Sequence, residues 1–444
     1  MADRLFGPSR TTPAMAAVVS EEAWLAAMLE VEVALAAAEA AVGLIPQEAA
    51  RAIAGAADAS AFDVARLGGE AAASGSPVLP LVRALTAAVP DHAAPFVHWG
   101  ATSQDTLDTA MMLVARRGLD CLLADLDALA DGCAALAERH RETLMAGRTL
   151  LQQALPITFG LKAAGWLGGV LAASDALLAA RSRLAVQLGG AAGTLSAFGD
   201  RGPEVVSQLS AHLQLAEPIL PWHAERSRVA LLGSALGVAA GTAGKIALDV
   251  ALLMQTEVAE VSEPAPGGSS AMPHKRNPVA AVEIDAAVRG AQAQAAVLLS
   301  AMRAEHERAA GAWQAEWPAL SDALLLTGGA VGRAAAMVGG LRVDERRMRG
   351  NLELTGGLIL SEQLMMVLAG PLGRPRAEEL VVSAVERARE RGRSFEAEVS
   401  EDSRILEHLT REQVAAALEP ASWLGSAATF VEAALTVYRD MHRS

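Results

Sequence analysis

Residues 266–278 read Pro-Gly-Gly-Ser-Ser-Ala-Met-Pro-His-Lys-Arg-Asn-Pro and separate two long apolar segments of the chain. The run combines a flexible glycine start with two hydroxyl groups and three possible cations. Asn277 and Pro278 predict the start of a helix, because Asn is a favoured N-cap residue and Pro a favoured first helical residue. Lys275 would then lie beside the positive end of that helix, where an anion is stabilised. The run therefore indicates an anion-binding loop.

Apolar residues recur with helical spacing on both sides of this loop. The pattern predicts long helices over 20–42, 102–144, 158–188, 227–261 and 278–310, and a further helix after Pro318. Ser20 is the expected N-cap of the first of these. Helices of this length exceed the mean of ~11–12 residues and are typical of bundles whose helices pack along their whole length. We therefore predict an all-α fold with a long central helix bundle, flanked by two smaller helical domains.

Changes in this pattern divide the chain into three predicted parts. They are an N-terminal helical domain over 1–100, the central bundle over 101–345, and a small C-terminal helical domain over 346–444 with shorter, more charged helices. The glycine-rich stretch 189–194 lacks the Gly-Lys-Ser/Thr of a phosphate loop. It predicts a tight turn between packed helices.

Composition excludes several classes of protein. The chain has 444 residues, of which 52% are hydrophobic and 3% aromatic. That apolar content is enough to offset chain entropy, so a disordered chain is excluded. Because Ala, Leu and Val supply most of it, helix is favoured over a β-sandwich. The most apolar stretch, 231–261, is interrupted by four charged residues and predicts a buried bundle helix instead of a membrane span.

Net charge limits the classes of binding partner, and cysteine content indicates the cellular compartment. The net charge is −14, from 37 basic and 51 acidic residues, which disfavours nucleic acid and anionic membranes as partners. Only Lys162, Lys245 and Lys275 are lysines. A GC-rich genome explains this, or these positions need a compact ammonium group. Two cysteines and a start without an apolar leader segment fit the reducing cytoplasm.

The pattern Gly-Ser-Ser-x-Met-Pro-x-Lys-x-Asn-Pro within 266–278 resembles the signature loop of the fumarase/aspartase superfamily, and we call these residues the signature loop. The resemblance implies a homotetramer with a multi-helix core, active sites shared between subunits, and a small polycarboxylate substrate. It implies no cofactor and no metal. It further implies that Ser269 is the catalytic base and Lys275 a second catalytic group that holds a carboxylate. Substrate contacts are implied for Ser270, Met272 and Asn277.

Two further blocks resemble the same superfamily. Residues 98–105 are similar to its second block, where Thr102 and Ser103 would hold a carboxylate at a helix N-terminus. Residues 147–153 are similar to its third block. Substrate contacts are thereby implied for His98, Thr102, Ser103, Arg148, Thr149 and Gln152. A further matched stretch over 305–308 implies one for His306. A structural ion pair is the alternative for Arg148. His223 and His274 also lie in matched stretches, whereas His92, His140, His212, His408 and His442 are interpreted as surface or structural.

Two departures from the superfamily pattern point to a branch of it. Fumarases and adenylosuccinate lyases carry a His that protonates the leaving group and a Glu that supports it; here these positions hold Leu150 and Val282. A hydroxide or amine leaving group needs that proton, whereas a carboxylate, whose acid has a pKa near ~4, does not. Lactonisation is such a reaction, and the sequence resembles the 3-carboxy-cis,cis-muconate cycloisomerases. Gln153 stands where some of them have His.

The resemblance thus implies cofactor-free lactonisation. A substrate carboxylate attacks the conjugated carbon, amides of the 267–270 loop stabilise the resulting charge, and Ser269 delivers a proton to carbon. Three alternatives stay open: a lyase that expels another weakly basic group, such as nitrite from nitrosuccinate, an adenylosuccinate lyase, and a catalytically silent structural protein.

Overall fold

The computed structural model describes residues 5–441 of the chain. These residues are mainly helical, with two short two-stranded antiparallel sheets, β1–β2 and β3–β4. The predicted all-α fold is confirmed. Two compact units are present: one comprises Met1–Asp127, Ala172–Gly244 and Glu283–Ala334, and the other Ala128–Leu171, Lys245–Val282 and Ala335–Ser444.

Five long helices each contribute residues to both units. They are α7 Ser103–Arg139, α8 Phe159–Arg181, α10 Ser227–Leu253, α11 Val279–Ser300 and α12 Ala312–Gly339. The predicted helices exist, but α7, α8, α10 and α11 end earlier than expected. The residues past their ends form turns, loops or strands: after α7 the chain forms strand β1, and after α10 it turns into strand β3. In α12 the expected start was also wrong, because Pro318 lies inside the helix.

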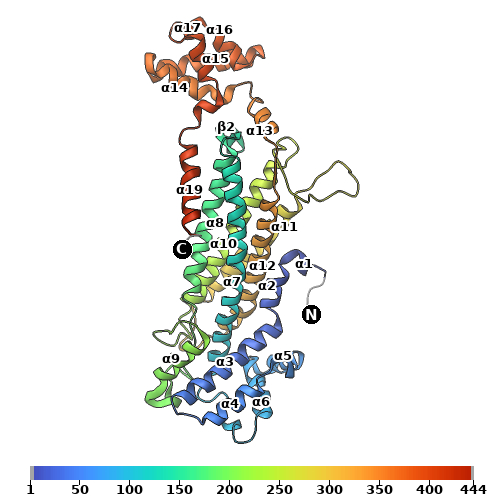
Figure 1. The fold of residues 1–444 in the computed structure, drawn as a ribbon, viewed down its shortest axis with the longest axis vertical. Coiled ribbons are helices and arrows are strands. Elements are labelled where there is room, and N and C mark those ends of the chain that lie inside the picture. Colours follow the sequence, from blue (N-terminus) through green and yellow to red (C-terminus); the bar gives the residue numbers. More distant parts are fainter. Residues whose placement is uncertain (1–4, 442–444) are drawn as a thin grey trace. The chain divides into compact units, whose positions relative to one another are not determined.

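The first unit is built around α3, Glu21–Ala41. The hydroxyl of Ser20 accepts a hydrogen bond from the amide of Ala23 at 3.1 Å, which confirms the predicted N-cap. Helix α3 packs against α4 and α9 (Figure 1). The remaining elements of this unit are α1 Gly7–Arg10, α2 Pro13–Val18, α4 Gln47–Ala56, η1 Ala59–Ala61, α5 Val64–Ser74, α6 Val78–Ala88, η2 Ala94–Phe96, η3 Ser196–Arg201 and α9 Gly202–Leu213.

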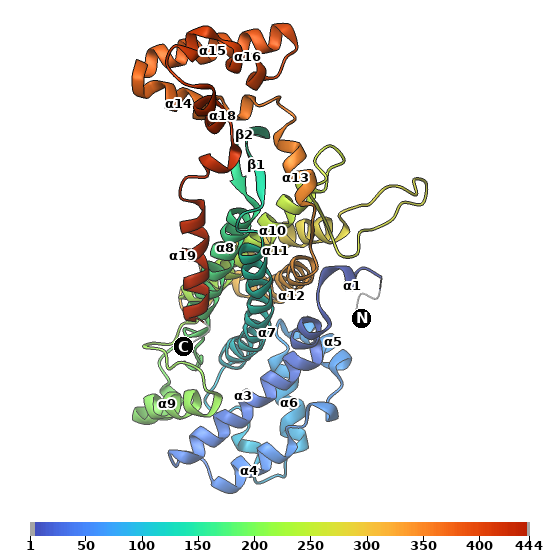
Figure 2. The same cartoon turned by 45° about the horizontal axis from the view of Figure 1, so that its top comes forward.

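The second unit contains a β-hairpin that the sequence did not predict, formed by β1 Leu144–Thr149 and β2 Gln152–Thr158 (Figure 2). Its two-residue turn is Leu150-Leu151, and both residues have positive φ angles, 51° and 64°. Turns of this kind usually hold Asn or Gly, so two leucines there are unusual. Their side chains are 97% and 78% exposed.

The rest of the second unit is a short sheet and the C-terminal helices. A buried apolar cluster that includes Phe395 and Leu364 holds most of those helices together. The elements are β3 Val261–Ser262, β4 Arg342–Val343, α13 Glu345–Leu352, η4 Leu358–Leu360, α14 Ser361–Leu372, α15 Arg374–Arg391, α16 Phe395–Glu401, α17 Ser403–Leu406, α18 Arg411–Ala417, η5 Pro420–Trp423 and α19 Ala427–Met441.

Two helices, α8 and α10, are long and apolar enough to cross a membrane by length and composition alone. In their most apolar windows, 50% and 44% of residues are already buried inside the fold. Core helices of a bundle have the same properties, which agrees with the interpretation of the apolar stretch over 231–261.

Candidate active site

The signature loop is closed at its neck by backbone hydrogen bonds. The amide of Gly267 donates to the carbonyl of Asn277 at 3.0 Å, and the amide of Asn277 donates back at 2.8 Å. The side-chain amide of Asn277 donates to the carbonyl of Gly268 at 3.0 Å. Two expectations are corrected by this geometry. Asn277 is not a helix N-cap, and the amide of Gly267 is not available to stabilise charge on a substrate.

The N-terminus of α11 is capped by a residue from the other side of the loop. Both carboxylate oxygens of Glu263 accept hydrogen bonds from the amides of Ala280 and Ala281, at 3.1 and 2.8 Å. Glu263 is buried. The positive helix end beside Lys275 was expected to attract a substrate anion. It is instead neutralised by a carboxylate of this chain.

The loop residues beyond the neck are mostly exposed. The hydroxyl of Ser269 accepts hydrogen bonds from the amides of Ala271 and Met272, at 3.3 and 3.2 Å. Two N–H donors aimed at one oxygen favour its charged form over its neutral form. Ser270 and Lys275 are exposed, and within residues 5–441 the ammonium group of Lys275 has no polar partner. The loop therefore presents an unpaired cation and a serine that receives two amide hydrogen bonds.

The third block lies on the β1–β2 hairpin. Arg148 forms a two-pronged ion pair with buried Glu260, with nitrogen–oxygen distances of 2.9 and 2.7 Å. The side-chain amide of Asn351 donates to the same carboxylate at 2.7 Å. The backbone carbonyl of Asn351 accepts a hydrogen bond from the side chain of Gln153 at 2.8 Å. The ion-pair alternative for Arg148 is thus present. Next to the exposed turn, Thr149 and Gln152 are also exposed.

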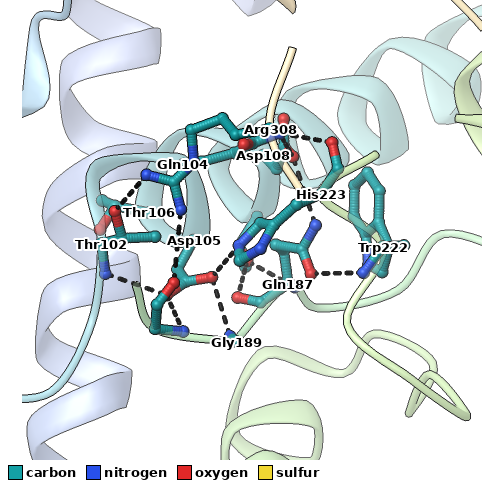
Figure 3. Close-up of polar contacts among 12 residues, drawn as sticks. Thr102, Gln104, Asp105, Thr106, Asp108, Gln187, Gly189, Trp222, His223 and Arg308 are labelled. Carbon is teal, nitrogen blue, oxygen red and sulfur yellow. Dashed lines mark hydrogen bonds and ion pairs between the residues drawn. The ribbon is translucent and has the colours of Figure 1, made fainter. Parts of the chain in front are cut away.

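The second block is organised around the buried carboxylate of Asp105 (Figure 3). Asp105 accepts hydrogen bonds from the amides of Thr102, Gly189 and Gly190, each at 2.9 Å. It also lies 2.7 Å from Nε2 of buried His223. The glycine-rich stretch that starts at Gly189 is therefore a turn, as predicted, and its amides hold a side chain of this chain.

Arg308 joins the start of α7 to the loop that carries His306. One of its guanidinium nitrogens donates to the hydroxyl of Thr102 at 3.0 Å, and another donates to the carbonyl of Ala191 at 3.0 Å. His306 is exposed and has a positive φ of 47°. Thr102 and Ser103 are half-buried. The structure thus ties the His306 loop to the predicted carboxylate-binding turn.

Beneath this turn lies a buried ion network. Arg226 donates to both oxygens of Asp108, at 2.7 and 3.0 Å, and its Nε donates to Glu316 at 3.0 Å. The indole of Trp313 donates to Asp108 at 2.9 Å. Burial raises the pKa of Glu316, although the hydrogen bond and positive charge of Arg226 oppose that rise.

His98 is paired with a carboxylate that the sequence analysis did not identify. Its Nδ1 lies 2.8 Å from an oxygen of Glu32, and the hydroxyl of Thr106 donates to the same oxygen at 2.8 Å. Burial works against the charged imidazole, but Glu32 and Asp105 outweigh it, so the pKa of His98 lies above its ordinary value.

Sequence reasoning overlooked Glu32 although the pattern held a clue. Met28, Glu32, Leu35, Glu39 and Val42 follow one another at spacings of four and three residues, so two acids interrupt the apolar stripe of α3. Acids at such positions are buried, and a buried acid needs a partner or a proton. Glu263 offered no comparable clue, because the two helix amides that donate to it lie seventeen and eighteen residues further along the chain.

Two of the three lysines are near one carboxylate. Lys245 forms an ion pair with Asp249. Burial lowers the pKa of Lys162, and Asp249 partly opposes this. Within residues 5–441, no group of three or more His, Cys, Asp or Glu side chains could hold a metal ion. Of the remaining histidines, His92, His212, His274 and His408 are exposed, His140 is buried, and His442 lies outside the described residues.

The predicted site residues fall into two groups. His98, Thr102, Ser103 and His306 belong to the first unit, whereas Arg148, Thr149, Gln152, Ser269, Ser270, Met272, Lys275 and Asn277 belong to the second. Each group contains hydrogen-bond donors or cations that can bind a carboxylate. The positions at which fumarases carry the His–Glu pair hold Leu150 and Val282.

This fold and these blocks define a lyase. The family described as "Lyase" matches residues 8–294, and "Adenylosuccinate lyase C-terminus" matches 357–434. The chain belongs to the fumarase/aspartase superfamily, to which both the fold and the signature loop correspond.

Relatives within the superfamily carry two kinds of name. The chain is 45% identical over 435 residues to a 3-carboxy-cis,cis-muconate cycloisomerase of Bradyrhizobium diazoefficiens, with 96% of each chain covered. It is also 45% identical over 445 residues to a nitrosuccinate lyase of Streptomyces davaonensis, covering 97% of this chain and 94% of that protein. The crystal structure of a 3-carboxy-cis,cis-muconate lactonizing enzyme from Pseudomonas putida superposes with a TM-score of 0.94 at 40% identity, covering 99% and 100% of the two chains.

Proposed function

We propose that the protein is a 3-carboxy-cis,cis-muconate cycloisomerase, which closes its substrate to 4-carboxymuconolactone, a step of protocatechuate breakdown. The observation that carries this proposal is the loss of both members of the acid pair, at Leu150 and Val282. Leu150 is 97% exposed at a hairpin tip and Val282 is 60% exposed. Neither side chain can give a proton, which favours a reaction whose attacking or leaving group is weakly basic, as a carboxylate is.

The chemistry follows from the two groups of donors. One substrate carboxylate attacks the conjugated carbon, and the electron pair of the double bond moves into the neighbouring carboxylate. Lys275, the side chain of Asn277 and the amides of 268–270 would stabilise that charge. The hydroxyl of Ser269 then gives its proton to carbon, and solvent restores the proton. The two amides that donate to the oxygen of Ser269 support the charged form of this serine.

Nitrosuccinate elimination is the second candidate. It is favoured by the relative from Streptomyces davaonensis, which is as similar in sequence as the cycloisomerase from Bradyrhizobium. Nitrite is also a weakly basic leaving group, so this reaction could likewise proceed without an acid at Leu150. The two reactions differ in the direction of proton transfer. The lyase reaction removes a proton from a carbon atom of the substrate, whereas lactonisation adds one.

A substrate panel separates the candidates. Purified protein is incubated with 3-carboxy-cis,cis-muconate, nitrosuccinate or adenylosuccinate, and diene absorbance, nitrite release and fumarate formation are followed. The proposal expects kcat/KM for 3-carboxymuconate to exceed the others by at least about 100-fold, because a site built for one set of carboxylates leaves polar groups unpaired with another. Preferential nitrite release would replace the proposal with the second candidate.

We further propose a cytoplasmic homotetramer whose active sites combine residues from different subunits. Support comes from exposed apolar side chains that a partner would cover, namely Leu150, Leu151, Ile219 and Leu220. The division into domains over 1–100, 101–345 and 346–444 is part of the same proposal. The absence of nucleic-acid and membrane partners is proposed on the net charge of −14.

Complementation tests the sharing of sites. Ser269→Ala removes the proton-transfer group of one chain, and Ser103→Asp places a negative charge where a substrate carboxylate should bind. An acidic residue in the first turn of α7 is compatible with folding. Subunit exchange between the two inactive variants should restore part of the activity. No recovery in samples shown by mass spectrometry to contain mixed tetramers would contradict shared sites.

A further inference from the structure

Glu32 is a buried carboxylate whose hydrogen bonds lead toward the predicted site. Its side chain is 1% exposed, and one of its oxygens accepts from both His98 and Thr106, each at 2.8 Å. The other oxygen is buried without a hydrogen-bond partner. A carboxylate that gives up its solvation needs strong compensation, and a positively charged imidazole supplies it.

His98 is held in an unusual backbone conformation next to this carboxylate. Its φ is 56°, in the left-handed region that residues other than glycine seldom adopt. Its ring is 15% exposed, and Nδ1 is committed to Glu32. The ring nitrogen that stays available to another molecule is therefore Nε2. Strain of this kind is kept where the surrounding structure requires one orientation of a side chain.

A second acid on the same helix provides a contrast. Glu39 lies seven residues after Glu32 and is fully buried, with no hydrogen-bond partner for either carboxyl oxygen. Burial and the negative charge of Glu32 raise the pKa of Glu39 to about 9. Glu39 is accordingly uncharged at neutral pH and makes no polar contact, whereas Glu32 lies against the Nδ1 of His98.

We propose that Glu32 is a positioning residue that holds His98 as an imidazolium, with Nε2 left to bind a carboxylate of the substrate. The inference rests on the proposed function, because that function places a polycarboxylate at His98. Glu32 lies outside the signature loop and outside the second and third blocks. The groups that face the imidazole are Glu32 from α3, and Asp105 and Thr106 from α7. Both carboxylates favour the charged ring.

The sign of the pH dependence follows. A histidine with a raised pKa keeps its charge to higher pH and loses it as the pH passes that pKa. Substrate binding through His98 should therefore weaken at the alkaline end of the pH profile, which we call the upper limb. Without the charge of Glu32 the limb should move to lower pH, so that KM rises at a pH where the wild-type protein still binds well.

The matched variants are Glu32→Gln and Glu39→Gln. They make the same change on the same helix, but one removes a charge and the other replaces a neutral acid by a neutral amide. For 3-carboxymuconate at pH 7, Glu32→Gln should raise KM about tenfold or more with little change in kcat, since a charge-assisted hydrogen bond of ~1.5–3 kcal/mol is lost. Glu39→Gln should leave KM within about twofold. Glu32→Asp, which keeps the charge, should recover part of the loss.

The rate of carbethoxylation with diethyl pyrocarbonate measures how far the His98 imidazole is protonated, and no substrate is needed. The reagent modifies neutral imidazole, and the tryptic peptide over 84–116 carries both His92 and His98. Tandem mass spectrometry therefore gives the rate at His98 with exposed His92 as an internal reference. Glu32→Gln should speed modification of His98 relative to His92 at pH 7, whereas Glu39→Gln should not.

Each outcome decides a part of the proposal. An unchanged rate at His98 in Glu32→Gln would overturn the role of Glu32, and a faster rate with unchanged KM would overturn the role of the pair in binding. If Glu32→Gln does not fold, the pH dependence of the modification rate in the wild-type protein replaces it, and a midpoint for His98 at or below that of His92 would then contradict the charged pair. If wild-type protein does not turn over 3-carboxymuconate, the proposed function fails, but the modification rates still test the pairing of Glu32 with His98.

Discussion

Arg226 is the residue whose removal should cost the most stability. Its guanidinium is fully buried between the carboxylates of Asp108 and Glu316, to each of which it makes two contacts. The variant Arg226→Met keeps the packing of the side chain and leaves two acids buried without their cation. Breaking a buried ion pair on one side typically costs about 3–5 kcal/mol, because an uncompensated charge remains.

The loss should depend on pH in a defined direction. Burial raises the folded-state pKa of Glu316 even with Arg226 present, and without Arg226 this pKa can only rise further. A carboxyl whose folded pKa exceeds its unfolded pKa imposes no penalty at pH values below the unfolded pKa. The penalty grows as the pH rises toward the folded pKa. The deficit of Arg226→Met should accordingly be larger at pH 8 than at pH 5.

Denaturant unfolding at equal protein concentration measures this deficit, since assembly shifts apparent stability. The triple variant Arg226→Met with Asp108→Asn and Glu316→Gln is the control, because it removes the stranded charges along with the cation. It should recover most of the loss at pH 8. A deficit below about 1 kcal/mol, or one that is equal at the two pH values, would refute the reasoning.

Three further outcomes are expected. Ser269→Ala should lower kcat at least ~100-fold with folding unchanged, whereas Ser270→Ala should lower kcat much less. Steady-state kinetics measures kcat and circular dichroism checks the folding; near-normal turnover by Ser269→Ala would contradict its role. Leu150→His should not raise kcat/KM for lactonisation, and a clear gain would mean that protonation of the oxygen limits the reaction. Glu263→Gln should destabilise the fold by ~1 kcal/mol, because a neutral amide replaces the charge at the positive end of α11; an unchanged unfolding midpoint would contradict this.

Local patterns allowed much of the fold to be predicted. The Ser20 N-cap depends on an amide three residues away, so the sequence contains the whole interaction. The ends of the long helices depend on residues that are distant in sequence. Past the end of α8, for example, the amide of Gln187 bonds to the hydroxyl of Thr109, and the apolar pattern does not change at that point. Neither helical periodicity nor composition predicts such contacts.

The candidate site divides in the same way. Residues that belong to a short motif, such as Ser269 and Lys275, could be proposed from the sequence. Their supporting partners are separated from them along the chain: Glu260 is 112 residues from Arg148, and Glu32 is 66 residues from His98. Only the interruption of the apolar stripe of α3 indicated that Glu32 is buried. The Asn277 N-cap was wrong because a distant carboxylate, that of Glu263, takes the role that the local pattern gave to Asn277.

The closed neck of the signature loop separates the anchoring of the loop from the side chains that it presents. Because Gly267 and Asn277 are paired and Glu263 is bonded to the first turn of α11, both ends of the loop are fixed to the scaffold. We expect that residues 268–276 can be replaced as a unit, because the hydrogen bonds between Gly267 and Asn277 and those of Glu263 do not involve their side chains. Loops of equal length from relatives could be transplanted between chains to trade reactivity, while the helices that carry them retain their stability.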